Sequence, residues 1–214
     1  MKILITAGPT YERIDPVRFI GNFSTGKMGF ALAQACAERN FDVVLIAGVV
    51  HLQIQHTNIE RIDVESAEQM YDAVMEHFPD CDAAIFCAAV ADFTPETVYS
   101  QKVKRNNNEL IIKLKPTKDI AAAAGIIKRK NQILVGFALE TNDEETNAIS
   151  KMQRKNLDMI VLNSLNDSGA GFGYDTNKVT IIKKDADKIS LPLLSKKNVA
   201  EKIIEEIICF QKSL

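Results

Sequence analysis

Short apolar runs alternate with helical segments along nearly the whole chain of 214 residues. Short, uninterrupted apolar runs are typical of strands that are buried on both faces of a parallel sheet. Segments long enough for a crossover helix separate several of these runs. The sequence therefore predicts an α/β protein with a doubly wound, mostly parallel, Rossmann-like sheet. The predicted strands are 2–6, 43–46, 59–64, 82–89, 109–115, 132–138 and 158–162.

Capping boxes mark two of the expected helix starts. In each box a Ser or Thr precedes a Gln or Glu by three residues, so both side chains can bond free N–H groups of the first turn. The boxes are 66–69 and 141–144, and their helices are expected to reach about 78 and about 156. A further helix is expected from Thr117.

The tail of the chain departs from this alternation. A turn-rich segment at 169–173 precedes two β-like runs, 177–183 and 188–193, which are expected to form a hairpin. Ser195 then caps a closing amphipathic helix. We therefore expect one domain, residues 1–214, with a C-terminal β-hairpin appendage at about 169–193.

Composition favours a cytoplasmic enzyme domain. The 26 Lys and Arg residues nearly balance 28 Asp and Glu residues, so no global field recruits nucleic acid or an anionic membrane. No apolar run reaches the length of a membrane span or resembles a signal segment. The cysteines form no C-x-x-C pair and are expected to be reduced thiols of the core. They are Cys36, Cys81, Cys87 and Cys209.

The segment 15–29 joins the first strand to its helix and concentrates polar chemistry. It carries Arg18, Asn22, Ser24 and Lys27 together with Gly21, Gly26 and Gly29. Glycines let the backbone approach a ligand, and unpaired N–H groups at a helix start attract phosphate or carboxylate oxygens. The loop is therefore predicted to bind an anion. The alternative is a loop that only turns the chain, but its length and side-chain chemistry are unusual for that role.

Two commoner nucleotide motifs compete for this region. Residues 21–27 fit G-x-x-x-x-G-K, but Met28 replaces the Ser or Thr that would bind magnesium. A dinucleotide G-x-G-x-x-G is absent after the first strand. A short-chain NAD(P)-dependent reductase is the alternative enzyme, although its Y-x-x-x-K pair, Tyr174 and Lys178, lies in a Gly-rich turn. A non-enzymatic nucleotide-sensing module is a third interpretation.

A second polar segment follows the strand expected at 82–89. Ala88 and Ala89 leave room for a ligand at the carboxyl end of this strand, where open α/β sheets bind substrates. Asp92 lies just beyond, where a carboxylate would hold magnesium or a ribose hydroxyl, or would only cap a turn. The cationic run 102–105 indicates a flap able to close over phosphates, although exposed lysines are usually only solvated.

Taken in order, these motifs resemble those of the phosphopantothenoylcysteine synthetase family over almost the whole chain. The matching motifs are D-P-V-R-F-I-x-N-x-S-x-G-K-M-G at 15–29, A-A-V-A-D at 88–92, K-V-K at 102–104, K-P-x-x-D-I at 115–120, V-G-F-A-x-E-T at 135–141 and K-N-x-D at 155–158. The resemblance implies a ligase that joins 4′-phosphopantothenate to L-cysteine in coenzyme A biosynthesis. It also implies an acyl-cytidylate intermediate, CTP as the nucleotide and Mg²⁺.

The resemblance implies roles for individual residues. Lys102 would stabilise charge at the α-phosphate, Asn22 would act when cysteine attacks the acyl-cytidylate, and Arg18 would support the same loop. The implied substrate-binding residues are Arg18, Asn22, Ala88 and Ala89. The implied nucleotide-binding residues are Gly8, Ser24, Gly26, Lys27, Gly29, Asp92, Lys102, Lys118, Asp119, Ile120, Phe137, Lys151 and Lys155. Asp92 is the implied magnesium ligand.

The resemblance also implies partners. The family is dimeric, with the loop of Asn22 reaching a site shared between subunits. The chain begins at the first strand of the synthetase, so we expect no decarboxylase segment and no flavin. A separate phosphopantothenoylcysteine decarboxylase is the expected protein partner, and the other ligands are small-molecule substrates. Thr117 and Lys118 replace the Asn-Pro of many members, which affects the expected contacts with the base.

Overall fold

The computed structural model describes all residues except 106–108, 141, 165–170, 172, 186 and 213–214. The strands of the central sheet are β1 (Lys2–Ala7), β4 (Asp42–Ala47), β5 (Ile59–Asp63), β6 (Ala83–Phe86), β9 (Ile133–Glu140), β10 (Met159–Ser164), β12 (Val179–Lys183) and β13 (Lys188–Ser190). Within the described residues they lie in the order β13-β12-β10-β9-β6-β1-β4-β5. Neighbours from β5 to β10 are parallel, whereas β12 is antiparallel to β10 and to β13. The predicted doubly wound, mostly parallel sheet is confirmed.

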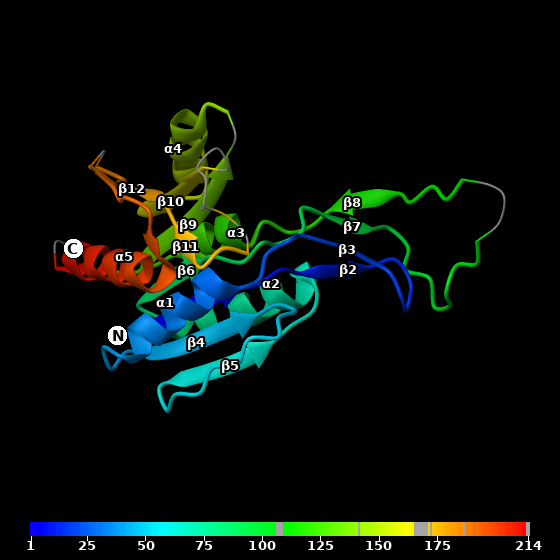
Figure 1. The fold of residues 1–214 in the computed structure, drawn as a ribbon, viewed down its shortest axis with the longest axis horizontal. Coiled ribbons are helices and arrows are strands. Elements are labelled where there is room, and N and C mark those ends of the chain that lie inside the picture. Colours follow the sequence, from blue (N-terminus) through cyan, green and yellow to red (C-terminus); the bar gives the residue numbers. More distant parts are fainter. Residues whose placement is uncertain (106–108, 141, 165–170, 172, 186, 213–214) are drawn as a thin grey trace.

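Helices cover both faces of this sheet (Figure 1). They are α1 (Lys27–Ala37), α2 (Ala67–His77), α3 (Ile120–Ile127), α4 (Glu144–Arg154) and α5 (Lys196–Gln211). Side chains of a strand alternate between faces, so Ile3 and Ile5 join the core under α1 and α5, while Leu4 joins the core under α2, α3 and α4. Each of the three is fully buried, which stabilises the fold by about 1.5–3 kcal/mol per side chain.

The predicted helix starts are confirmed in part. Ser66 and Gln69 form the reciprocal capping box of α2. The helix expected from Thr117 begins three residues later, because the Asp119 carboxylate accepts a hydrogen bond from the first turn of α3. The Thr117 hydroxyl instead donates to the carbonyl of Ala91. The chain therefore uses the acidic side chain, not the threonine, as the cap.

The start of α4 differs from the expected capping box. Thr141 lies outside the described residues, so its part in a box is not tested. The N-cap is Asp143, which has a left-handed backbone (φ 44°) and makes no side-chain capping bond. α4 ends at Arg154, two residues before the expected end.

The segment 109–115 is not the central strand that its pattern predicts. Only its end belongs to β8 (Leu114–Pro116), which pairs antiparallel with β7 (Phe93–Pro95). This ribbon and the hairpin of β2 (Tyr11–Arg13) and β3 (Phe19–Gly21) form an arm that projects from the sheet (Figure 1). Ile111 is 77% exposed. The apolar pattern indicated an extended segment but carried no information about its pairing partner.

The tail hairpin forms as predicted, from β12 and β13. Because β12 also pairs with β10, the hairpin continues the central sheet. A short ladder between β11 (Thr176–Asn177) and β14 (Leu194–Ser195) leads into α5. Ser195 accepts a hydrogen bond from the backbone N–H of Asn198, which confirms it as the cap of α5. Among the described helices, none is long and apolar enough to cross a membrane.

Candidate active site

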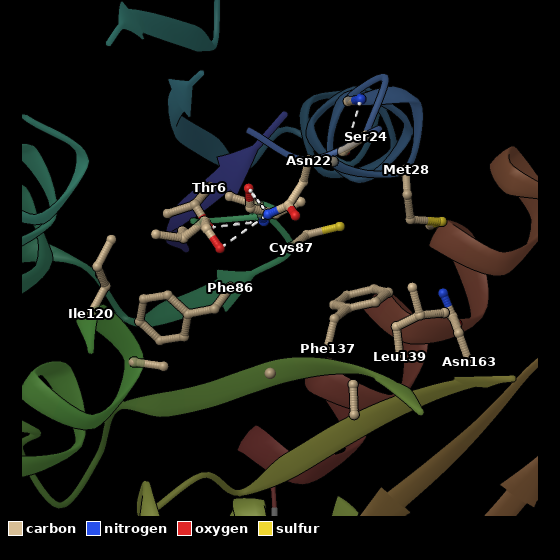
Figure 2. A pocket seen from close by; sticks show the side chains of 18 of the residues that line it. Thr6, Asn22, Ser24, Met28, Phe86, Cys87, Ile120, Phe137, Leu139 and Asn163 are labelled. Atoms are coloured by element: carbon tan, nitrogen blue, oxygen red, sulfur yellow. Dashed lines mark hydrogen bonds between the residues drawn. The ribbon is translucent and has the colours of Figure 1, made fainter. Parts of the chain in front are cut away.

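A cavity of about 570 Å³ opens at the carboxyl ends of β1, β6 and β9. Thr6 of β1, Phe86 of β6 and Phe137 of β9 all line it (Figure 2). The chain builds β4 and β5 on one side of β1 and places β6, β9 and β10 on the other. The cavity therefore lies where the strand order reverses, which is the usual ligand site of an open α/β sheet.

The predicted anion loop forms one wall of this cavity. Ser24, Gly26, Lys27 and Gly29 all line it, and no side chain caps the N-terminus of α1. Gly26 has a left-handed backbone (φ 78°), and its N–H donates to the Ser24 hydroxyl at 3.3 Å. The uncapped helix start carries a partial positive charge. This wall therefore suits an anionic ligand.

Two glycines fit α1 against the sheet. A Cβ on Gly29 would lie 2.4 Å from the Cβ of Ala7, so only glycine allows this close approach to β1. Gly8 is not among the cavity-lining residues. It has φ +79°, and a Cβ added to Gly26 would lie 3.4 Å from the Gly8 Cα. Gly8 therefore lies close beside the loop that faces the cavity.

Asn22 connects this loop to the small-residue segment. Its side-chain amide donates to the carbonyls of Ala89 (3.1 Å) and Val90 (3.2 Å), as the dashed lines in Figure 2 show. Ala88 and Ala89 line the cavity beside it, and the Ala88 N–H donates to the Thr6 hydroxyl. Two segments that are about 67 residues apart in sequence thus meet at one amide.

Basic and acidic groups form the opposite wall. The Lys155 ammonium lies 2.9 Å from the Asp119 carboxylate, and the Lys151 ammonium donates to the Phe137 carbonyl at 3.1 Å. Burial raises the pKa of Asp119, but hydrogen bonds from Lys155 and the α3 backbone outweigh it and hold the pKa below its ordinary value. Burial, helped by Lys155, lowers the pKa of Lys151.

Asp92, Lys118 and Ile120 also line the cavity, as the sequence analysis expects of site residues. Asp92 is exposed. The Lys118 ammonium lies 4.4 Å from the ring centroid of Tyr71 and 3.9 Å from a Glu68 oxygen. Cation–π and ion-pair contacts of this kind hold the side chain of Lys118 toward α2.

Arg18 lies between β2 and β3 and Lys102 between β7 and β8, so both belong to the arm, and neither is among the cavity-lining residues. Lys102 is exposed. Arg18 forms an ion pair with the buried Asp15 and donates to the carbonyl of Val103 at 2.9 Å. One copy of the chain therefore gathers most of the expected site residues at the cavity, but not Arg18, Lys102 or Gly8.

The sequence analysis missed a polar cluster at one end of the cavity. Lys196 is only 8% exposed, and its ammonium donates to the carbonyls of Gly171 and Tyr174. Burial, followed by repulsion from Lys27, lowers the pKa of Lys196. The buried Asn177 donates to Asn163 at 3.3 Å. No local pattern distinguishes these residues from an ordinary helix start and strand ends.

All four cysteines are free, as expected, but only two belong to the core. Cys36 and Cys81 are buried, whereas Cys209 is exposed and Cys87 lines the cavity. Burial raises the pKa of the Cys87 thiol to about 12. The cavity thus holds a thiol in its protonated form.

Comparison with known proteins identifies the family of the chain. Residues 1–210 match the model of the DNA/pantothenate metabolism flavoprotein C-terminal domain. The chain belongs to this family. The flavoprotein C-terminal domain thus accounts for almost the full sequence, and the resemblance to phosphopantothenoylcysteine synthetases drawn from the motifs is confirmed at the level of the family.

Relatives of this flavoprotein C-terminal domain include longer proteins. One, named cysteine/cysteine sulfinic acid decarboxylase, from an unknown prokaryotic organism, is 55% identical over 207 residues, which cover 97% of this chain and 58% of that protein. The coenzyme A biosynthesis bifunctional protein CoaBC of Bacillus subtilis (strain 168) is 49% identical over 210 residues, covering 98% of this chain and 52% of that protein. The chain thus spans little more than half the length of these relatives.

Solved structures share the fold of this flavoprotein C-terminal domain. The C-terminal domain of a CoaBC protein superposes with a TM-score of 0.85 at 40% identity and covers 100% of this chain and 96% of that one. A Cab2 variant in complex with phosphopantothenate-cysteine gives a TM-score of 0.78 at 17% identity, over 99% of this chain and 86% of that one. The second likeness shows the fold alone.

Proposed function

We propose that the chain is a phosphopantothenate–cysteine ligase that uses CTP and acts in coenzyme A biosynthesis. The observation that carries this proposal is the convergence of the anion loop, the small-residue segment and the Lys151–Lys155 wall on one cavity. The match of residues 1–210 to the family model supports the proposal, as does the similarity to the coenzyme A biosynthesis protein CoaBC of Bacillus subtilis, which is 49% identical.

The proposed reaction has two steps. The carboxylate of phosphopantothenate attacks the α-phosphorus of CTP and pyrophosphate leaves, which forms an acyl-cytidylate. The cysteine amine then attacks the acyl carbon, CMP leaves and an amide forms. Charge develops on phosphate oxygens in the first step, where positioned cations lower the barrier. Lys102 is assigned to this step and Asn22 to the second.

The cavity fits magnesium that arrives with the nucleotide. Among the described residues no group of three or more His, Cys, Asp or Glu side chains could hold a metal ion. Mg²⁺ at nucleotide sites is commonly bound by one or two carboxylates together with substrate phosphates. Asp92, an exposed carboxylate on the cavity wall, matches that arrangement. When bound, the ion would neutralise phosphate charge.

A second part of the proposal concerns the base of the nucleotide. The Phe137 backbone and the Lys151 ammonium lie together, 3.1 Å apart, at the wall assigned to the nucleotide. Backbone carbonyls and ammonium donors of this kind can read the edge of a pyrimidine. We therefore propose that CTP is preferred over ATP. Equal turnover with both nucleotides at matched low concentration would contradict this preference.

The structure weakens the reductase alternative. Tyr174 is 55% exposed and lies outside the helices and strands, and Lys178 lies between β11 and β12. Short-chain reductases need their Tyr and Lys one helical turn apart and a dinucleotide glycine fingerprint after the first strand. The described residues provide neither arrangement.

The test of the proposed function is substrate-dependent release of pyrophosphate. The protein is incubated with CTP, Mg²⁺ and phosphopantothenate, with and without cysteine, and products are followed by mass spectrometry. With cysteine we expect pyrophosphate, CMP and the amide in equal amounts. Without cysteine we expect pyrophosphate and the acyl-cytidylate, with no amide. Release without phosphopantothenate, or formation of CDP, would contradict a ligase of this type.

We further propose that the active form is a homodimer whose arms are shared. Apolar side chains lie exposed along the arm in one copy: Val17, Phe19, Phe93, Val98, Tyr99, Ile111 and Leu114. Exposed apolar groups in such number mark a protein interface. In one copy Lys102 is also not among the residues that line the cavity. A second copy would cover the arm and bring its Lys102 to the cavity of the first.

Mixing two inactive variants tests this arrangement. If one copy supplies Asn22 and the other supplies Lys102, a heterodimer of Asn22→Asp and Lys102→Gln contains one intact site. Random exchange should then restore about a quarter of the wild-type activity. If one copy supplies both residues, no heterodimer site is intact and activity stays low. Light scattering measures the oligomeric state in parallel.

A further inference from the structure

Asp15 is a buried carboxylate to which the proposed reaction assigns no role. It lies at the turn between β2 and β3 and is only 1% exposed. One oxygen, Oδ1, accepts hydrogen bonds from the backbone N–H groups of Val17 and Arg18, both at 2.9 Å. These two bonds form a local turn. They use only one of the two carboxylate oxygens, so the turn does not explain the contacts of the other.

The other oxygen reaches a distant segment. Oδ2 accepts the N–H of Val103 at 3.1 Å and the guanidinium of Arg18. Arg18 in turn donates to the Val103 carbonyl at 2.9 Å. Both polar groups of the Val103 peptide are therefore bonded to one ion pair, 85 or more residues away in sequence. Hydrogen bonds to charged groups are the stronger ones. The Asp15 side chain is fully buried, whereas the Arg18 side chain is 40% exposed.

Val103 immediately follows Lys102, which the proposed reaction places at the α-phosphate. Lys102 itself is exposed, and no hydrogen bond or ion pair to another described residue holds its side chain in place. A neighbouring backbone bond, from the Tyr99 N–H to the Ile14 carbonyl at 2.9 Å, joins the same two segments. The hairpin that holds Asp15 continues through β3 to Asn22, only one residue beyond its end.

We infer that Asp15 is a positioning residue, which with Arg18 fastens the Lys102 segment to the hairpin that carries Asn22. The Lys102 segment then keeps a fixed place on the arm, from which the proposed dimer brings Lys102 to the cavity of the second copy. This inference rests on the proposed function for its catalytic part. The hydrogen bonds hold the pKa of Asp15 well below its ordinary value, chiefly through Arg18, so the carboxylate keeps its charge at neutral pH.

The substitution Asp15→Asn separates this role from that of a turn residue. An asparagine oxygen can still accept the Val17 and Arg18 N–H groups, as in many turns. Its NH₂ group cannot accept from Val103 or from the guanidinium. Glu65→Gln is the matched control, because Glu65 pairs with Arg13 on the same hairpin and contacts neither Val103 nor Lys102.

Hydrogen exchange of the Val103 amide measures the fastening directly, in protein carrying nitrogen-labelled valine. We expect Asp15→Asn to accelerate this exchange about tenfold and Glu65→Gln to leave it unchanged. Unchanged exchange in Asp15→Asn would overturn the inference. Acceleration of equal size at core valines such as Val44 would also overturn it, since Asp15 would then only stabilise the whole fold.

Kinetics test whether the fastening acts through Lys102. Asp15→Asn should lower kcat for pyrophosphate release about tenfold with KM for CTP little changed, and should cause no further loss in a Lys102→Gln background. Fully additive losses would overturn the positioning role. Full activity of Lys102→Gln alone would overturn the function proposed for Lys102, whereas exchange at Val103 would still test the fastening by itself.

Discussion

The ammonium group of Lys155 lies 2.9 Å from the carboxylate of Asp119, so the end of α4 is bonded to the start of α3 at the rim of the cavity. Asp119 also caps α3 by accepting the Ala122 N–H at 3.1 Å. One carboxylate thus serves a helix start and a cavity wall at once. Changes at Asp119 should therefore affect both stability and nucleotide binding.

Asp119→Asn should make stability depend less on pH. Asparagine keeps the capping oxygen, so the variant removes mainly the ion pair with Lys155. The folded-state pKa of Asp119 lies below the ordinary 3.8, so the ion pair stabilises the fold above about pH 4 and its contribution is lost as the pH falls through the folded pKa. The carboxylate is 45% exposed, so we expect a difference of at most about 1 kcal/mol at neutral pH.

Urea unfolding of wild type and Asp119→Asn at about pH 7 and about pH 3 checks this prediction. The difference in free energy of unfolding should shrink toward zero at the lower pH. Asp72→Asn, which alters an exposed carboxylate of α2, is the control. A difference that grows on acidification would show that the pKa of Asp119 is raised in the folded state.

Lys102→Gln should suppress the first half-reaction. Removal of the ammonium leaves the charge on the α-phosphate and pyrophosphate without this donor, and losses of about two to three powers of ten in kcat follow from removing one such group. Single-turnover release of pyrophosphate measures the step. Lys104→Gln, two residues along the same exposed run, is the matched control and should release pyrophosphate at the wild-type rate.

Asn22→Asp should impair the second half-reaction. Its NH₂ group donates to the carbonyls of Ala89 and Val90, and a carboxylate there would face two oxygens without a donor. We expect the acyl-cytidylate to form and to accumulate, because the loop no longer presents it to cysteine. Rapid quenching with mass spectrometry detects it. Failure of this variant to release pyrophosphate would reassign Asn22 to substrate binding or assembly.

Lys128→Met should destabilise the fold strongly. The Lys128 ammonium lies 2.5 and 2.6 Å from the oxygens of Asp158, and the two side chains are only 9% and 7% exposed. Asp158 also accepts the Leu134 N–H at 2.7 Å, which fixes β9 beside β10. The variant leaves a buried carboxylate without its partner cation, which costs about 3–5 kcal/mol.

Chemical unfolding measures the free energy of unfolding that Lys128→Met loses. The m-value should be unchanged, which shows that stability has changed and not the compactness of either state. Lys197→Met, which removes a solvent-exposed i,i+4 pair with Glu201 on α5, should change the free energy of unfolding far less. Equal losses of unfolding free energy in the two variants would contradict the prediction, because burial of the Lys128–Asp158 pair would then add nothing to the cost of breaking it.

Features set by neighbouring residues could be predicted from the sequence. Apolar runs located the parallel strands of the central sheet, which are β1, β4, β5, β6, β9 and β10. Ser66 and Ser195 cap the helices that they were expected to cap. The 109–115 segment was misassigned, because the same apolar pattern suits a buried strand and an exposed ribbon. Lys196 gave no signal at all, because a lysine in the first turn of a helix is ordinary unless its surroundings are known.

The sequence by itself determined the α/β alternation, the anion loop before α1 and the family, since each depends on covalent neighbours or on motif order. The tertiary structure decided which of these residues meet. It brought Asn22 to Ala89 and Lys155 to Asp119, and it placed Lys102 on the arm beside Asp15 and Arg18. Such contacts depend on strand order and on burial of the whole core, which no local pattern encodes.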